Sequence, residues 1–79
     1  MQEIQKPHIG KIMCQYLSDN GITKKWLAQK VGSDYPNFCK LLQKQSLDAY
    51  LIAQISVFLK HDFFTYFSQY VSENSKNTL

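Results

Sequence analysis

The chain has 79 residues, 44% of them hydrophobic and 14% aromatic, and a formal net charge of +3 at pH 7. This length is that of one domain and excludes a two-domain enzyme, and the hydrophobic share argues against a disordered chain. All nine basic residues are lysines. The chain therefore cannot make the bidentate hydrogen bonds by which arginine binds guanine or phosphate.

The sequence shows no sign of secretion, membrane insertion or metal binding. Its longest apolar run covers residues 49–53, far fewer than the ~20 residues of a spanning helix, and residues 1–7 lack the apolar region of a signal peptide. Two cysteines, Cys14 and Cys39, are too few for a disulfide scaffold. With His8 and His61 they form no pair at the close spacing of structural zinc sites. We therefore expect a cytoplasmic bacterial protein with reduced thiols, no cofactor and no membrane contact.

Apolar periodicity and end signals predict the first two helices. Residues 1–7 are polar and predict a loose arm, after which an apolar stripe recurs at helical spacing. The stripe consists of Ile9, Ile12, Met13, Tyr16 and Leu17. Gly21 is expected to end this helix in a left-handed conformation. Thr23 is expected to cap a second helix that ends at Gly32, with Leu27, Ala28 and Val31 facing inward.

A third helix is predicted to begin near residues 34–36, and its N-cap residue is open between two choices. Asp34 has the better capping side chain, whereas Pro36 at the first helical position would make Tyr35 the cap. The apolar positions of this helix are Phe38, Leu41 and Leu42.

Two further helices complete the predicted fold. Asp48 is expected to cap a fourth helix, whose apolar face carries Leu51, Ile52, Ile55, Phe58 and Leu59. Asp62 is expected to cap a fifth, in which Phe63, Phe64 and Phe67 cover the core and Tyr66 and Tyr70 lie on an adjoining outer face. Residues 72–79 are polar and predict a frayed tail. The sequence thus predicts an all-α domain of five helices over residues 8–71.

The most informative segment covers residues 23–42, TKKWLAQKVGSDYPNFCKLL. Two helices joined by about four residues that include a glycine form a helix-turn-helix unit. Small Ala28 lets the third helix cross close to the second, and Gly32 supplies the positive φ that the turn needs. Residues 24–44 hold five lysines and one aspartate, a charge of +4, so that the rest of the chain carries −1. Positive charge is therefore concentrated on this unit.

With its flanking helices, the segment resembles the phage-repressor and Cro-like (XRE) helix-turn-helix family over roughly residues 9–60. The resemblance implies a five-helix, lambda-repressor-like DNA-binding domain that regulates transcription as a repressor and needs no cofactor. It implies that the third helix lies in the DNA major groove and places Tyr35, Pro36, Asn37 and Lys40 toward the bases. It places Thr23, Lys24 and Lys25 at the start of the second helix near a phosphate, where helix N-termini hold anions. It places Lys44 near the DNA backbone beyond the third helix.

Two residues depart from the family pattern. Ser33 stands where relatives usually have an apolar residue, and Pro36 stands where they often have a base-reading amide. We expect Asn37 to read adenine, Pro36 to touch a thymine methyl group, and Lys40 to contact a phosphate.

One recognition helix covers few base pairs, so the double-stranded DNA partner implies a homodimer. We expect this dimer to join through Tyr66 and Tyr70 of the fifth helix. A protein-interaction module of the same fold, such as an antitoxin whose C-terminal helix binds a toxin, is the alternative. An enzyme is not expected, because the sequence shows no Ser/His/Asp set, phosphate-binding glycine loop or paired carboxylates.

Overall fold

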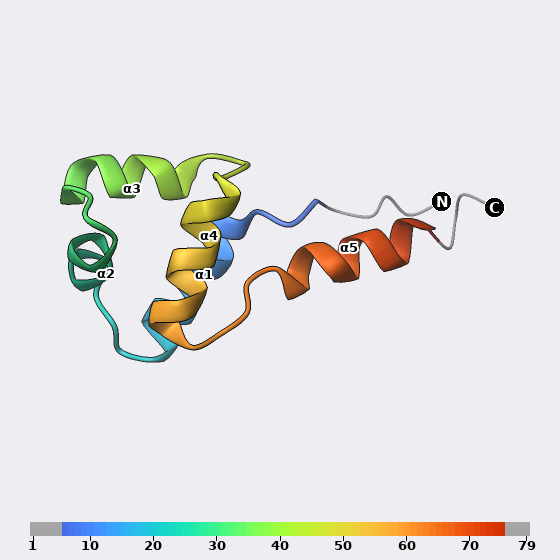
Figure 1. Ribbon diagram of the computed structural model, residues 1–79, viewed down its shortest axis with the longest axis horizontal. Coiled ribbons are helices and arrows are strands. Elements are labelled where there is room, and N and C mark those ends of the chain that lie inside the picture. The colour runs from blue at the N-terminus through green and yellow to red at the C-terminus, as the bar shows by residue number, and fades with distance from the viewer. Residues whose placement is uncertain (1–5, 76–79) are drawn as a thin grey trace.

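The computed structural model describes residues 6–75, so the expectations for residues 1–5 of the arm and 76–79 of the tail lie outside the described residues. This part of the chain folds into five helices and contains no strand, which confirms the expected all-α class. The helices are α1 (Ile9–Asp19), α2 (Lys24–Val31), α3 (Tyr35–Gln43), α4 (Ala49–Leu59) and α5 (Thr65–Ser75) (Figure 1). No helix within residues 6–75 has the length and apolar character that crossing a membrane requires.

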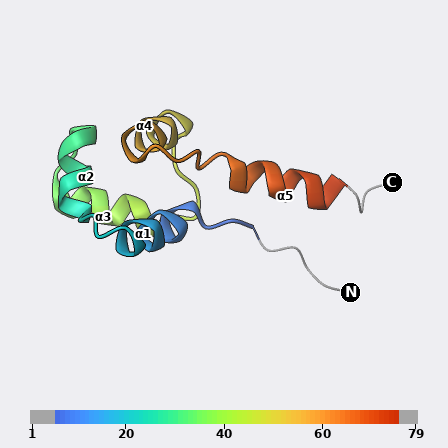
Figure 2. The same cartoon turned by 90° about the horizontal axis from the view of Figure 1, so that it is seen from below.

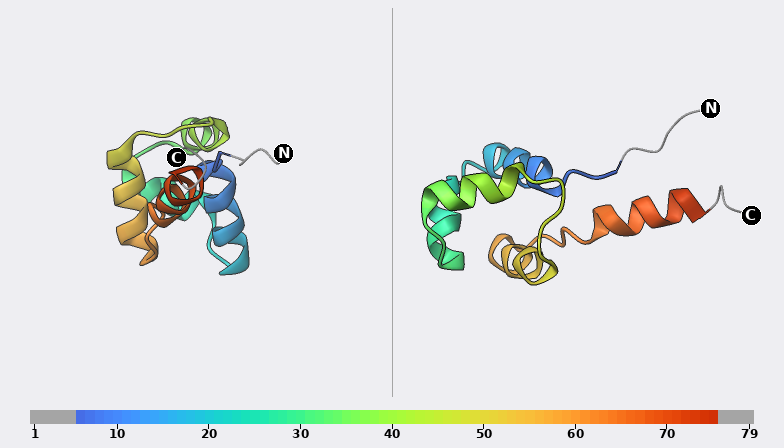
Figure 3. Two further views of the ribbon diagram at one scale, coloured as in Figure 1. Left: turned by 90° about the vertical axis from the view of Figure 1, so that its right-hand side faces the viewer. Right: turned by 90° about the horizontal axis from the view of Figure 1, so that it is seen from above.

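Helices α1 to α4 form a body from which α5 extends. α3 packs against α1 and α2, and α2 also packs against α4. Figures 1 and 2, drawn at right angles, both show α5 leaving this body along the long axis of the molecule. Figure 3 shows the same separation from above. The principal extents of 44 × 23 × 22 Å reflect this projecting helix.

The core of the body is built from the apolar stripes that the sequence predicts on α1 to α4. Its fully or almost fully buried side chains are Ile9, Met13, Leu17, Leu27, Ala28, Phe38, Leu42, Ile52, Ile55, Leu59 and Phe63. Phe63 comes from the turn before α5, and α5 itself contributes no buried residue. Hydrophobic burial therefore holds four helices together, while α5 is attached mainly through its first turn.

The end signals read from the sequence correspond to observed caps. Thr23 Oγ1 accepts a hydrogen bond from the Trp26 backbone N–H at 3.1 Å, and Asp48 accepts from two N–H groups of the first turn of α4. Asp34 Oδ2 accepts from the Asn37 N–H at 3.2 Å, so Asp34 and not Tyr35 caps α3. Gly32 has a φ of 76° and ends α2 as expected.

The start of α5 differs from the expectation that Asp62 caps it. Asp62 Oδ1 accepts from the Phe64 N–H at 2.9 Å, and this bond to the residue two positions on closes a separate turn. The helix begins only at Thr65 and continues to Ser75, past the expected end at Val71. Because Phe63 and Phe64 precede the helix, the face of α5 that meets the core also changes.

Three aromatic residues lie differently from the prediction. Phe64 is 37% exposed, and Phe58 of α4, also expected inside, is 39% exposed. Tyr66 does not face outward: its hydroxyl lies 2.9 Å from His61 Nε2, and its ring centroid lies 6.1 Å from that of Phe63. The Tyr66 side chain therefore makes its contacts within its own chain.

Lys60 is the residue that ends α4, and it takes a left-handed conformation with a φ of 54°. A side chain disfavours this conformation, which glycine adopts freely. We expect Lys60→Gly to raise the free energy of unfolding by about 0.5–1 kcal/mol, as measured by urea denaturation. Gly32→Ala is the opposite control, because a Cβ there meets open space at a φ of +76°, and it should lower stability through the backbone alone. A destabilised Lys60→Gly variant would contradict the strain argument.

Candidate nucleic-acid interface

The predicted helix-turn-helix unit consists of α2, α3 and the three residues between them. Gly32 turns the chain, and the Ser33 N–H donates to the Ala28 carbonyl at 2.9 Å. Leu27, Ala28 and Phe38 are buried where the two helices meet. This packing fixes α3 with its buried side toward the core and its polar side toward solvent.

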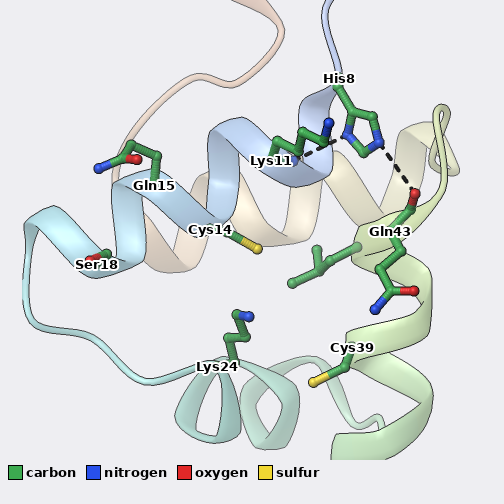
Figure 4. Close-up of a pocket in the computed structure, with 9 residues that line it drawn as sticks. His8, Lys11, Cys14, Gln15, Ser18, Lys24, Cys39 and Gln43 are labelled. Carbon is green, nitrogen blue, oxygen red and sulfur yellow. Dashed lines mark hydrogen bonds between the residues drawn. The ribbon is translucent and has the colours of Figure 1, made fainter.

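A hollow of about 480 Å³ lies between α1, the start of α2 and α3 (Figure 4). We call it the lysine groove; its lining residues are His8, Lys11, Cys14, Gln15, Ser18, Lys24, Cys39, Leu42 and Gln43. Two of them are lysines and none is acidic. The Lys24 side chain points from α2 into the space between the other two helices, and the sulfur atoms of Cys14 and Cys39 face the same space. The groove is thus a concave, positively charged surface with a partly apolar floor.

The angle between α1 and α3 is fixed at their crossing. Gly10 is buried there, and a Cβ atom on this residue would overlap the backbone carbonyl of Leu42. His8 Nε2 also lies 3.2 Å from the Gln43 carbonyl oxygen, which ties the start of α1 to the end of α3 (Figure 4). Close backbone contact and this bond together hold both walls of the lysine groove.

Tyr35 stands at the first position of α3 and is 47% exposed. A hydrogen bond with Cys39, together with the negative charge of a Cys39 thiolate, raises the pKa of the Tyr35 hydroxyl, and the positive charge of Lys24 opposes this in part. The hydroxyl is uncharged at neutral pH, as an ordinary tyrosine already is, and it is able to donate a hydrogen bond. The structure brings Tyr35, Cys39 and Lys24 together at the end of the groove where α2 and α3 begin.

The other predicted base-facing residues are exposed along α3. Pro36 is in its first turn, where a missing N–H has no cost. The Asn37 Nδ2 group donates to Asp34 Oδ1 at 2.7 Å. Because the amide nitrogen carries two hydrogens, this bond orients the Asn37 side chain and leaves one hydrogen and the amide oxygen for another partner. Lys40 is exposed one turn further on.

The predicted phosphate-contacting lysines do not all belong to the groove. Lys24 lines it, whereas Lys25 and Lys44 are exposed outside its lining. Lys30, in the same basic stretch, has its ammonium group 5.4 Å from the centroid of the Trp26 ring on the same helix.

Sequence reasoning missed the α1 wall of the groove. Lys11, Gln15 and Ser18 recur at helical spacing on the polar side of the predicted first helix, and this stripe was the available signal. What the sequence does not show is that this side of α1 faces α3.

The two residues expected at a dimer contact lie beside Pro7 and Ile12 of the same chain. Tyr66 and Tyr70 are half-buried and line a small hollow together with Pro7 and Ile12.

Within residues 6–75, no three His, Cys, Asp or Glu side chains gather as a metal-binding cluster.

Comparison of this chain with protein-family models, with curated proteins and with solved structures finds no match.

Proposed function

We propose that the chain is a DNA-binding transcriptional regulator that reads an operator through α3 in the major groove and acts as a repressor in the bacterial cytoplasm. The observation that carries the proposal is the lysine groove: a positively charged hollow without carboxylates, lined in part by later residues of α3, the helix whose first turn is exposed. A positively charged groove beside an exposed helix such as α3 suits a DNA duplex, because contacts to the phosphates supply a large share of the binding free energy.

The exposed residues divide into two roles. Lys11, Lys24, Lys25 and Lys44 contact phosphates as point charges, and the start of α2 at Thr23 adds backbone N–H groups. Tyr35, Pro36, Asn37 and Lys40 face the base edges or the adjoining backbone. The neutral Tyr35 hydroxyl donates without repelling phosphate, and Asp34 holds the Asn37 amide ready to pair with adenine.

A lysine-only reader gains little specificity from each contact, because lysine lacks the rigid fork of arginine. Two copies on two half-sites, one DNA turn apart, would supply the affinity and the operator length that one copy lacks. The proposed regulator therefore acts as a homodimer.

The second candidate is an antitoxin-like module that binds another protein. Apolar side chains exposed on α4, such as Tyr50 at 70% and Val57 at 73%, favour it. Salt-dependent binding of the purified chain to duplex DNA separates the two candidates. DNA binding releases counterions and weakens as salt is added, whereas binding through an apolar surface has no such salt dependence.

Alanine substitution of Lys25 and of Lys44 tests the proposal. Duplexes are first selected from a random pool with the unmodified chain, and log affinity is then measured against log salt concentration. Each substitution should reduce the slope by ~0.9 and weaken all selected duplexes about equally, because each removes one phosphate contact. Lys60→Ala, at the end of α4, is the matched control and should leave the slope unchanged. A slope unaffected by either test substitution would exclude this basic surface as the DNA-binding face.

A further inference from the structure

Helix α4 presents a second apolar face that the core does not use. Its core side carries Ile52, Ile55 and Leu59. Round the helix, five residues at helical spacing form what we call the α4 stripe: Tyr50, Ala53, Gln54, Val57 and Phe58. They line a shallow hollow of about 270 Å³ and include no charged side chain. Tyr50 and Val57 are 70% and 73% exposed, so this apolar surface is left open to water.

Within residues 6–75, helix α5 buries none of its side chains against the body. It extends away from the body (Figures 1 and 3), has no buried residue, and has only 11 residues. A helix of this length is marginal alone in water and is normally stabilised by packing one apolar face. Tyr66 and Tyr70 lie on the side near Pro7 and Ile12.

Another side of α5 carries an apolar row that begins at the core and runs outward. We call Phe64, at the end of the preceding turn, with Phe67 and Val71 the α5 stripe. Phe67 is half-buried against the core, whereas Phe64 is 37% and Val71 59% exposed. The row therefore starts on the body and continues onto the unsupported part of the helix.

We infer that the α5 stripe of a second copy of this chain covers the α4 stripe, and that a two-fold axis makes the exchange reciprocal. The two stripes are similar in length, since they span residues 50–58 and 64–71, each about 10–12 Å at the helical rise per residue. They also match in charge, because neither stripe holds an ionised side chain that burial would penalise. Reciprocal use of two different patches by identical chains is the symmetry of a closed dimer.

The uncovered side chains supply a large part of such an interface. With about 150–250 Å² as the full area of an aromatic side chain, the exposed fractions of Tyr50, Phe58 and Phe64 leave about 220–370 Å² open per chain. Two chains therefore offer about 440–730 Å² of aromatic surface, to which the exposed parts of Val57 and Val71 and a polar rim add, against about 1,000 Å² for a specific interface.

The assignment of this interface goes beyond the proposed function, which requires a homodimer but names no contact surface, and it does not depend on DNA binding. No residue of either stripe lines the lysine groove, so both grooves stay open in the dimer and the association needs no DNA. It also replaces Tyr66 and Tyr70 as the dimer contact, because those side chains face the other side of α5.

Charge introduction at one residue of each stripe tests the exchange. Sedimentation equilibrium without DNA, at tens of micromolar chain, should show a dimer for the unmodified protein. Val57→Lys and Val71→Glu should each weaken association at least tenfold and give folded monomers, since both side chains are largely exposed in one chain. An equimolar mixture of the two variants should regain the dimer, because one of its two contacts is unmodified and the other pairs the introduced lysine with the introduced glutamate.

Gln69→Glu, on the side of α5 that lines the hollow with Tyr66, adds the same charge to the same helix and should remain dimeric. Circular dichroism confirms that each variant keeps its helices. The inference is overturned by a monomeric unmodified chain, by a Val57→Lys or Val71→Glu variant that dimerises normally, or by folded variants that stay monomeric when mixed. Because no arm contains DNA, these results are independent of the salt-dependence experiment on DNA binding.

Discussion

Replacing Gly10 by alanine is expected to lower the free energy of unfolding by about 3 kcal/mol or more. Gly10 is fully surrounded where α1 crosses α3, and an added Cβ would overlap the carbonyl of Leu42. The neighbour is backbone, so it cannot rotate away as a side chain would. Overpacking a tight site costs about 1–3 kcal/mol even when side chains yield, and a domain of this size has only about 5–15 kcal/mol in total.

The sign of this change in stability distinguishes a close helix crossing from an effect of helix propensity. Helix propensity alone predicts the opposite sign, because alanine is favoured over glycine by about 1 kcal/mol inside a helix. Urea denaturation followed by circular dichroism measures the difference. Gly21→Ala is the matched control: its φ is +66° and no atom lies near an added Cβ, so about 1 kcal/mol should be lost. A Gly10→Ala variant as stable as the unmodified chain would show that α1 and α3 do not cross as described.

The same crossing shows what the sequence could and could not predict. The stripe at Ile9, Met13 and Leu17 predicts helix α1 and its buried side, because apolar spacing is a local signal. The role of Gly10 is not local: it depends on the distance to Leu42 of α3, which is 32 residues further along the chain. In the sequence, Gly10 is only a weak helix former among good ones.

The candidate interface likewise combines residues that local sequence patterns predict with residues that only helix packing brings together. Thr23, Asp34 and the exposed positions of α3 belong to one continuous segment, so their caps and turn could be predicted from their spacing. The half of the lysine groove supplied by Lys11, Gln15 and Ser18 requires α1 to lie beside that segment. No local pattern contains that information, since it arises from packing between helices.

The sequence predicts the wrong buried side of a helix where apolar residues are too frequent to mark one face. In α4, AYLIAQISVFL, apolar side chains occur all round the helix, so Phe58 was assigned to the core although it lies on the exposed stripe. Before α5, the turn closed by Asp62 takes Phe63 and Phe64 out of the helix. The rotation of every later residue then changes, which is why Tyr66 faces the core and not solvent.

Replacing Lys24 by glutamate is expected to weaken DNA binding about 30-fold or more while leaving the fold intact. Lys24 points into the lysine groove, where its ammonium would neutralise a phosphate. The substitution removes this attraction and adds a repulsive charge between the groove walls. A loss of about 2 kcal/mol in binding free energy corresponds to that factor. Stability should hold or rise slightly, because Lys24 begins α2 and an acidic side chain at a helix N-terminus contributes about 0.3–1 kcal/mol.

Fluorescence anisotropy with a selected duplex at about 0.1 M salt measures the effect, and urea denaturation of the same samples measures stability. Lys60→Glu makes the same change in net charge at the end of α4, outside the groove. At this salt concentration charges more than about 10 Å apart are largely screened, so the control should weaken binding no more than about threefold. Equal weakening by both variants would mean that DNA senses only the overall charge of the protein. A selective loss at Lys24 assigns the phosphate to the space between α1 and α3, because from α2 that is where this side chain reaches.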